Sequence, residues 1–288
     1  MTMRKRTRRT MGTVATLIFI LLALVVAFFL VPWSKTKAEF ESAVKSRAES
    51  GYSHSDLFSE DDIKDLPSPV RRYFRYCGYI GTVKMSYMKA TFKDVDFILS
   101  DSKTVKINYT QYNFVEEPER FAYISSSMYG IPFEGFDSFG NGTGRMKGII
   151  AKLVTLFDQE GRSMDKASLV TVLAECLLVP NVAIQDYIVW EGIDETHAKA
   201  SIRYNSISAS GIFTFDSDGA LISFSTGDRI ATAMDGKERE AAWTATLGDY
   251  REVDGVKQPK VLKSIWHYPE GDVVYFNDNG AEVEIEYH

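Results

Sequence analysis

The feature that most constrains this chain is an uncharged run near its start, from Thr10 to Ser34. The run contains the segment VATLIFILLALVVAFFLV, which is close to the ~20 apolar residues that a helix needs to cross ~30 Å of hydrocarbon. We therefore predict a transmembrane anchor over residues 13–33. The rest of the chain must then fold on one side of a membrane.

Basic residues lie directly before the run and predict its orientation. They are Arg4, Lys5, Arg6, Arg8 and Arg9. Because positively charged flanks stay in the cytoplasm, we predict a cytoplasmic tail over residues 1–12 and an extracytoplasmic C-terminal body. The alternative is a cleaved signal peptide, whose apolar stretch usually covers ~7–15 residues and ends in a small-residue cleavage site. Here the stretch is longer and ends in FFLVPWSK, where Trp33 suits the membrane interface, so we expect an uncleaved anchor.

The charge of the rest of the chain excludes one class of partner. The sequence has 33 basic and 39 acidic residues, and five of the basic ones lie in the tail. The remainder balances 28 basic residues against 39 acidic ones, a net charge of −11. Binding of nucleic acid needs clustered Lys and Arg, so nucleic acid is not expected as a partner.

Cysteine and histidine give no sign of a metal site. Cys77 and Cys176 are the only cysteines and lack the paired spacing of zinc ligands, and the four histidines are scattered. Two buried thiols are expected, with a disulfide in an oxidising exterior as the alternative. The segment GNGTGRMKG lacks the ending of a phosphate loop, and DSDG at residues 216–219 leads into a strand, so both are interpreted as turns. We expect no metal and no cofactor.

Two helical segments are predicted after the anchor. Residues 34–65 should form a juxtamembrane helical stalk, because SKTKAEFESAVKSRAES is polar and rich in helix formers. In LPSPVRRYFRYCG, Ser68 can cap a second helix, Pro69 suits its first turn and Gly78 its end. This second helix opens the main domain, which is predicted to cover residues 66–288.

From residue 82 onward the apolar pattern has a period of two, which is typical of β-strands. Tight hairpins are indicated by Asn141-Gly142, Asp218-Gly219, Asp254-Gly255 and Asn279-Gly280, since these dipeptides accept positive φ angles. The segments expected to be strands include TVKMSYMKATF, KTVKINYTQYNF, RFAYISSSM, GRMKGIIAKLVTLF, AKASIRYN, GIFTFD, ALISFST, AAWTATLGDY, KVLKSIWHY, DVVYF and AEVEIEY. This pattern predicts an antiparallel meander without βαβ units.

One apolar segment interrupts the strands, ASLVTVLAECLLVPNVAI at residues 167–184. A helix from about Ser163 to just before Pro180 would have ~16 residues and span ~24 Å, too short for a second membrane crossing. Its polar residues Asp165, Ser168, Thr171 and Glu175 share one stripe, and the wide apolar remainder must be surrounded. The predicted fold is therefore α+β and mainly antiparallel β, with a strongly curved sheet, or half-barrel, wrapped around a central apolar helix.

The order of several motifs resembles a bacterial membrane-anchored family of unknown function. The motifs are LPSPVRRYFRYCG, GNGTGRMKG, SLVTVLAECLLVPNVAI, WEGIDETHAKASI, the Asp228-Arg229 pair and IWHY, and the resemblance covers residues 66–288. The family pattern has an aromatic residue before the helix proline, where this chain has Leu178-Val179. The resemblance points to bacteria, so the predicted anchor would lie in a bacterial cell membrane, and the resemblance indicates no particular activity or catalytic residue. At the level of fold only, the plan is similar to the periplasmic lipoprotein carriers and related lipid-binding half-barrels.

Glu175 is the most informative candidate site residue, because a buried carboxylate needs protonation or a partner. Arg229 in STGDRIA is the expected partner, since arginine binds carboxylates in a bidentate manner. Trp243, Trp266 and Phe224 are further candidate ligand-binding residues from the aromatic strands. The alternative for Glu175 is an exposed or purely structural position on the polar stripe.

Three functions from different classes follow. The first is a membrane-anchored extracytoplasmic module that binds a lipid or other apolar ligand, because the chain is rich in aromatic residues and a pocket between a curved sheet and an apolar helix tends to be mostly apolar. The alternative is that the same aromatic residues only fill the core. The second is a scaffold of the cell envelope that recognises an unidentified protein through its acidic surface or an open sheet edge. The third is a hydrolase using Glu175, Asp228 or His267, which ranks last because the sequence contains no hydrolase motif.

Overall fold

The computed structural model describes residues 2–49, 56–100, 103–128, 130–233, 235–278 and 282–288. The chain forms two compact units, Met1–Lys35 and Thr36–His288. The first unit consists mainly of helix α1 (Thr2–Leu30), the one helix among the described residues that is long and apolar enough to cross a membrane. The predicted apolar N-terminal helix is thus present, and its properties fit a membrane anchor or a signal sequence.

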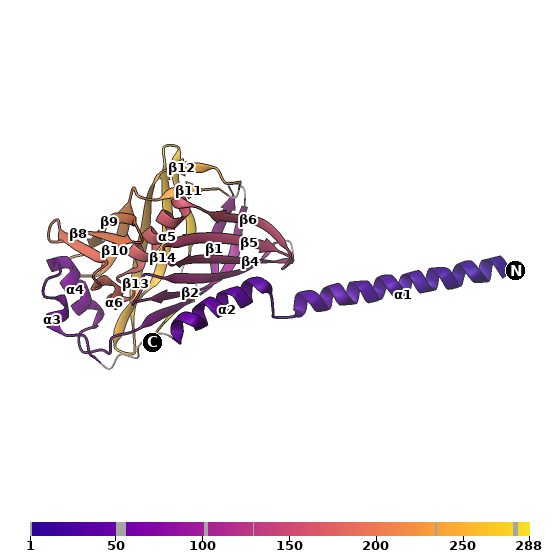
Figure 1. The fold of residues 1–288 in the computed structure, drawn as a ribbon, viewed down its shortest axis with the longest axis horizontal. Coiled ribbons are helices and arrows are strands. Elements are labelled where there is room, and N and C mark those ends of the chain that lie inside the picture. The colour runs from indigo at the N-terminus through magenta and orange to yellow at the C-terminus, as the bar shows by residue number, and fades with distance from the viewer. Residues whose placement is uncertain (1, 50–55, 101–102, 129, 234, 279–281) are drawn as a thin grey trace. The chain divides into compact units, whose positions relative to one another are not determined.

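The second unit is built on one large antiparallel sheet (Figure 1). Its helices are α2 (Lys35–Ala48), α3 (Glu60–Ile63), α4 (Ser68–Cys77), α5 (Arg162–Glu175) and α6 (Pro180–Ala183). Its strands are β1 (Tyr87–Ser100), β2 (Lys103–Phe114), β3 (Arg120–Met128), β4 (Ile131–Gly140), β5 (Thr143–Ile150), β6 (Val154–Glu160), β7 (Ile188–Gly192), β8 (His197–Tyr204), β9 (Ile207–Phe215), β10 (Leu221–Thr226), β11 (Ile230–Thr232), β12 (Glu238–Glu240), β13 (Ala242–Val253), β14 (Val256–Tyr268), β15 (Gly271–Asn277) and β16 (Val283–Tyr287).

The strand order is mostly sequential, as the alternating pattern predicts. The 14-stranded sheet runs β6-β5-β4-β3-β2-β1-β15-β14-β13-β10-β9-β8-β7, while β16 also pairs with β1 and β11 pairs with β12 apart from the sheet. The long strand β1 joins the two halves, because residues 88–92 pair with β16 and residues 96–97 with β15. The prediction of a mainly antiparallel meander is confirmed, with these non-sequential pairings as additions.

Turn chemistry accounts for most of the hairpins. Asn141 and Gly142 both have positive φ angles, of 53° and 77°, and Asp254 and Gly255 have φ angles of 51° and 83°, as tight hairpins require. The predicted turn at Asn279-Gly280 lies outside the described residues. The segment GRMKGIIAKLVTLF was expected to be a single strand, but it is the hairpin of β5 and β6. Its turn is at residues 151–152, which are Ala and Lys with φ angles of 54° and 60°.

Helix α5 shows that the sheet is strongly curved. It contacts β4, β5 and β6 at one end of the strand order and β8 and β9 at the other (Figure 1). The turns of the two ends also approach each other, since the rings of Phe139 and Tyr204 lie 6.2 Å apart. The terminal strands β6 and β7 do not pair with each other, so the sheet remains an open half-barrel around the helix. The predicted fold class is confirmed.

The apolar arc of α5 is buried as predicted. Leu169, Val170 and Leu173 are fully inaccessible, and the helix contributes to one continuous core with α4 and the concave face of the sheet. The helix ends at Glu175, four residues earlier than expected, because residues 176–178 form a turn before α6 begins at Pro180. Both Cys77 and Cys176 are free, buried thiols, as expected.

The predicted stalk is not a free-standing segment. On α2, Phe40 is buried against the convex face of the sheet, with ring centroids 5.9, 5.7 and 5.9 Å from those of Tyr112, Tyr123 and Phe136. An ion pair between Arg47 and Glu119 holds the end of this helix to the sheet. Helix α2 is thus part of the folded body.

Candidate functional site

The candidate site residues fall into two groups on the concave face of the sheet. Arg229, Trp243, Trp266 and Phe224 lie together, whereas Glu175 belongs to a separate cluster. We call the Glu175 group the carboxylate cluster, which comprises Glu175, Arg120, Asp137, Tyr109, Gln111 and Asn113. The other group, the arginine–tryptophan site, comprises Arg229, Trp243, Trp266 and Thr171.

In the carboxylate cluster, the partner of Glu175 is Arg120 and not Arg229. Glu175 Oε2 accepts hydrogen bonds from Arg120 Nε at 2.8 Å, Asn113 Nδ2 at 2.7 Å and Gln111 Nε2 at 3.1 Å. The expected pair with Arg229 is therefore wrong. Arg229 follows β10 and contacts α5 one turn before Glu175, whereas β2 and β3 direct their inward side chains at the end of the helix.

The positive charge of Arg120 is balanced by two carboxylates, Glu175 and Asp137. Its Nη1 donates to Asp137 Oδ2 at 2.8 Å, its Nη2 donates to the hydroxyl of Tyr109, and its side chain is only 6% exposed. Burial alone would lower the pKa of Arg120, but Glu175, Tyr109 and Asp137 raise it well above its ordinary value. The guanidinium therefore stays charged. This cluster is a satisfied buried network, which favours the structural interpretation of Glu175.

The sequence contains a signal for this cluster. In β2 the inward positions run Ile107, Tyr109, Gln111 and Asn113, so two amides stand where an inward face should be apolar. Arg120 likewise precedes the apolar inward residues of β3. Polar residues at predicted core positions indicate a buried network, although the sequence does not show which strands meet α5.

At the arginine–tryptophan site, the guanidinium of Arg229 lies over two indole rings. Its Cζ is 4.6 Å from the ring centroid of Trp243 and 5.7 Å from that of Trp266. Its Nη1 donates to Thr171 Oγ1 at 2.9 Å, and its buried Nε has no hydrogen-bond partner among the described residues. Cation–π contact contributes ~0.5–2 kcal/mol, whereas a buried donor without an acceptor costs ~1–3 kcal/mol. Arg229 is thus held in place without being fully satisfied.

Asp228, which precedes Arg229 in the sequence, is paired with other residues. Asp228 accepts from Lys166 Nζ at 2.6 Å and from the backbone amide and the hydroxyl of Ser210, at 2.8 and 3.0 Å. Within the described parts of the chain, Arg229 forms no ion pair with any carboxylate.

Aromatic side chains extend from this site along the strands β13 to β15 and β1. The Trp243 indole donates to the hydroxyl of Tyr275 at 3.1 Å, and Trp266 stacks on Tyr275 and Tyr268 with centroids 6.0 and 6.3 Å apart. Phe97 meets Tyr275 edge to face. We define the aromatic wall as the half-buried side chains of Phe97, Tyr268, Val273 and Tyr275 beside Trp266. Phe224 is fully buried behind Trp243, so it supports this site from the core.

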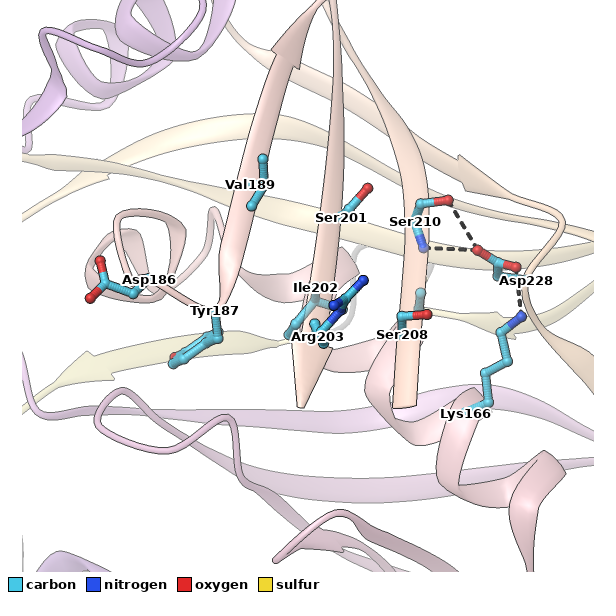
Figure 2. Close-up of a pocket in the computed structure, with 11 residues that line it drawn as sticks. Lys166, Asp186, Tyr187, Val189, Ser201, Ile202, Arg203, Ser208, Ser210 and Asp228 are labelled. Carbon is cyan, nitrogen blue, oxygen red and sulfur yellow. Dashed lines mark hydrogen bonds and ion pairs between the residues drawn. The ribbon is translucent and has the colours of Figure 1, made fainter. Parts of the chain in front are cut away.

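A pocket of about 560 Å³ lies elsewhere, over β7, β8 and β9 (Figure 2). Val189, Ser201 and Ser210 form a row across these strands, and Ser201 alternates with the buried Ala200 and Ile202. The pocket includes Lys166 of α5 but none of the candidate aromatic residues. Its lining mixes serines and charged side chains with Tyr187, Val189, Ile202 and Ala209, so it differs from the mainly apolar cavity expected between helix and sheet.

The three residues considered for hydrolysis are far from forming one site. Glu175 is bound by Arg120 and Asp228 by Lys166. His267 has Nδ1 2.8 Å from Asp272 Oδ1 and Nε2 2.9 Å from Thr244 Oγ1, on strands β13 to β15 in the middle of the sheet. No group of three potential metal ligands is found among the described residues.

Comparison with known proteins gives a family and two distant structural neighbours. Residues 56–277 match the family of unknown function DUF6544. A crystal structure of a domain described as an outer membrane lipoprotein-sorting protein, from Vibrio parahaemolyticus, is 12% identical, with a TM-score of 0.37 over 71% of this chain and 84% of that one. A LolA superfamily protein from Nitrosomonas europaea is 8% identical, with a TM-score of 0.38 over 76% and 93%. No curated protein shows significant similarity.

Proposed function

The chain belongs to the DUF6544 family, and from its structure we propose that it is a membrane-anchored module that binds an apolar or amphipathic ligand on the concave face of its half-barrel. One observation carries the proposal. The apolar residues of α5 are buried in the core, yet the side chains of the neighbouring aromatic wall on the same concave face are only partly buried. A surface of this kind is suited to an apolar ligand.

Covering a further ~100 Å² of the aromatic wall would contribute roughly 2.5 kcal/mol at ~25 cal/mol per Å². Aromatic rings also lose little conformational entropy on binding, because they have few rotatable bonds. The described part of the chain thus offers a preformed contact surface.

The proposed location follows from the first unit. We place residues 13–33, which include most of α1, in a bacterial cell membrane as an uncleaved anchor, with residues 1–12 in the cytoplasm and residues 66–288 outside. The uncharged apolar run and the basic residues before it support this orientation.

Two matched valines allow a direct test. Val273 pairs with Trp266 on the aromatic wall, whereas Val189 is 67% exposed on β7 and lines the polar pocket. The full chain and the variants Val273→Ser and Val189→Ser are purified from the native membrane, and bound apolar compounds are extracted and quantified by mass spectrometry. We expect a stoichiometric compound in the wild type and in Val189→Ser, and a clear loss in Val273→Ser. A folded wild type without such a compound, and with no gain in melting temperature on adding lipids, contradicts the proposal.

An open edge of the sheet supports a second candidate, an envelope scaffold. The terminal strand β6 and the turn before it expose Leu153, Val154 and Leu156, at 74%, 55% and 42%. An exposed apolar edge can add a strand from another protein. A photo-crosslinker at Val154 should then capture one repeatable protein partner in the native envelope, and capture of none rules this candidate out.

A further inference from the structure

We propose, on the basis of the binding function above, that the ligand is an anionic amphiphile whose carboxylate or phosphate pairs with Arg229 while its apolar chain lies along the aromatic wall. Arg229 carries a positive charge, but its partners among the described residues are two indole rings and a hydroxyl, which are all uncharged.

Arg229 is a half-buried cation without a counter-charge among the described residues. Its neighbour Asp228 is engaged by Lys166, and Glu175 is engaged by Arg120. The chain beyond the basic tail has 11 more acids than bases, so acids are plentiful and the lack of one at this position is specific. An anion supplied by a ligand would provide the missing charge.

The geometry of Arg229 leaves donors for such an anion. A guanidinium that lies over aromatic rings keeps its N–H groups for hydrogen-bond acceptors. Among the described residues, only Nη1 has an acceptor, the hydroxyl of Thr171. The planar fork matches the geometry of carboxylates and phosphates, which it binds in a bidentate manner.

The surroundings of Arg229 favour an amphiphile over a small free anion. Trp266 lies under the guanidinium and also begins the aromatic wall, where it stacks on Tyr275 and Tyr268. A molecule with a charged end at Arg229 therefore meets half-buried rings directly beside that end. Inorganic phosphate could satisfy Arg229 but would leave the wall uncovered.

The test uses bromine quenching of the two site tryptophans. The chain has four tryptophans, so a Trp33→Phe, Trp190→Phe background leaves Trp243 and Trp266 as reporters. The full chain is placed in nanodiscs of zwitterionic phosphatidylcholine and titrated with ω-bromooctanoate or with the neutral ω-bromooctanol. We expect the anion to quench at a concentration at least about tenfold lower, the effect of one charge-assisted hydrogen-bonded pair.

Variants assign the preference to one side chain. Arg229→Gln should abolish the preference for the anion, while Arg203→Gln, at an exposed position on β8, should leave it unchanged. Arg229→Lys keeps the charge but loses the fork, so it should retain part of the preference and also serves if Arg229→Gln does not fold. A preference that survives in Arg229→Gln, or in Arg229→Lys at full size, overturns the inference.

The remaining outcomes separate this inference from the proposed function. Equal quenching by both amphiphiles overturns the assignment of an anionic ligand but leaves the apolar binding function intact. If neither amphiphile quenches the fluorescence, both the anionic ligand and the proposed binding function are overturned. If inorganic phosphate displaces ω-bromooctanoate at equal concentration, the site binds free anions, and the assignment of an amphiphilic ligand is overturned.

Discussion

Two arginines on the concave face of the half-barrel, Arg120 and Arg229, have opposite kinds of partners. Arg120 is enclosed by Glu175 and Asp137, with Tyr109 on its remaining nitrogen. Arg229 has two indole rings and one threonine hydroxyl, and no acid in the described parts of the chain. The first arrangement completes a structural network, while the second leaves the buried Nε of Arg229 without an acceptor among the described residues. Burial of a charged residue therefore indicates function less well than the state of its partners does.

The largest difference is expected between the buried core and the aromatic wall, in how fast a cysteine at each place reacts with a thiol reagent. Burial raises the pKa of Cys77 to about 12, so at pH 8 about one thiol in ten thousand is ionised. A cysteine introduced on the aromatic wall by Val273→Cys should react with Ellman's reagent at least ~100-fold faster than the native thiols. The native chain, measured folded and then in denaturant, is the control. Rapid reaction of Cys77 or Cys176 in the folded chain contradicts a sealed core.

Removal of Arg120 should cost far more stability than removal of Arg229. Arg120→Leu leaves Glu175 and Asp137 without their counter-charge, so we expect a loss of ~3–5 kcal/mol in the free energy of unfolding. Arg229→Leu removes cation–π contacts and should cost about 1 kcal/mol. Urea unfolding of the full chain measures both. Similar losses of unfolding free energy in the two variants would contradict the contrast between Arg120 and Arg229. If the double variant Arg120→Leu, Glu175→Leu is more stable than Arg120→Leu alone, the loss comes from leaving Glu175 without its counter-charge.

The contact between α5 and β5 provides a test of intermediate size. A Cβ added to Gly144 would lie 2.5 Å from Met164 O and from Ser168 Oγ, so β5 could no longer approach the helix. We expect Gly144→Ala to destabilise the chain by ~1–3 kcal/mol. Gly248→Ala is the matched strand control, because a Cβ there meets nothing within 4 Å. Equal stability of the two variants would show that close packing of α5 on this side is unimportant.

The smallest expected effect concerns the acid beside Arg229. Burial alone would raise the pKa of Asp228, but Lys166 and Ser210 lower it below its ordinary value. Because the pKa is lower in the folded state, this stabilisation is present above the unfolded pKa and is lost as the pH falls through the folded pKa. The melting temperature of the wild type should therefore decline more between about pH 5 and pH 3 than that of Asp228→Asn. Parallel declines would show that the ion pair with Lys166 contributes nothing.

Local patterns in the sequence predict most of the fold, because helix caps, glycine turns and the period of apolar residues act over few residues. Ser59 and Asp62 form a capping box at the start of α3, and Gly78 ends α4 with a φ of 80°, as predicted for Gly78. The turn at residues 151–152 was missed because Ala and Lys seldom adopt positive φ angles, so nothing local marked it.

The partner of Glu175 was missed for a different reason. Which strand faces the end of α5 depends on how far the sheet curves, a property of the whole sheet that no short segment encodes. Proximity in the sequence to a strong strand made Arg229 a reasonable candidate, yet Arg120, 55 residues before Glu175, makes the contact. The amides of β2 were the available sign that an acid is bound there.

The position of α5 has a mechanical consequence. Because this helix contacts β5 and β6 near one end of the strand order and β8 and β9 near the other, both end groups of the sheet pack against one element. Thr171 links the same helix to Arg229. Arg229 is therefore joined, through a single hydrogen bond, to the element that the two ends of the sheet share.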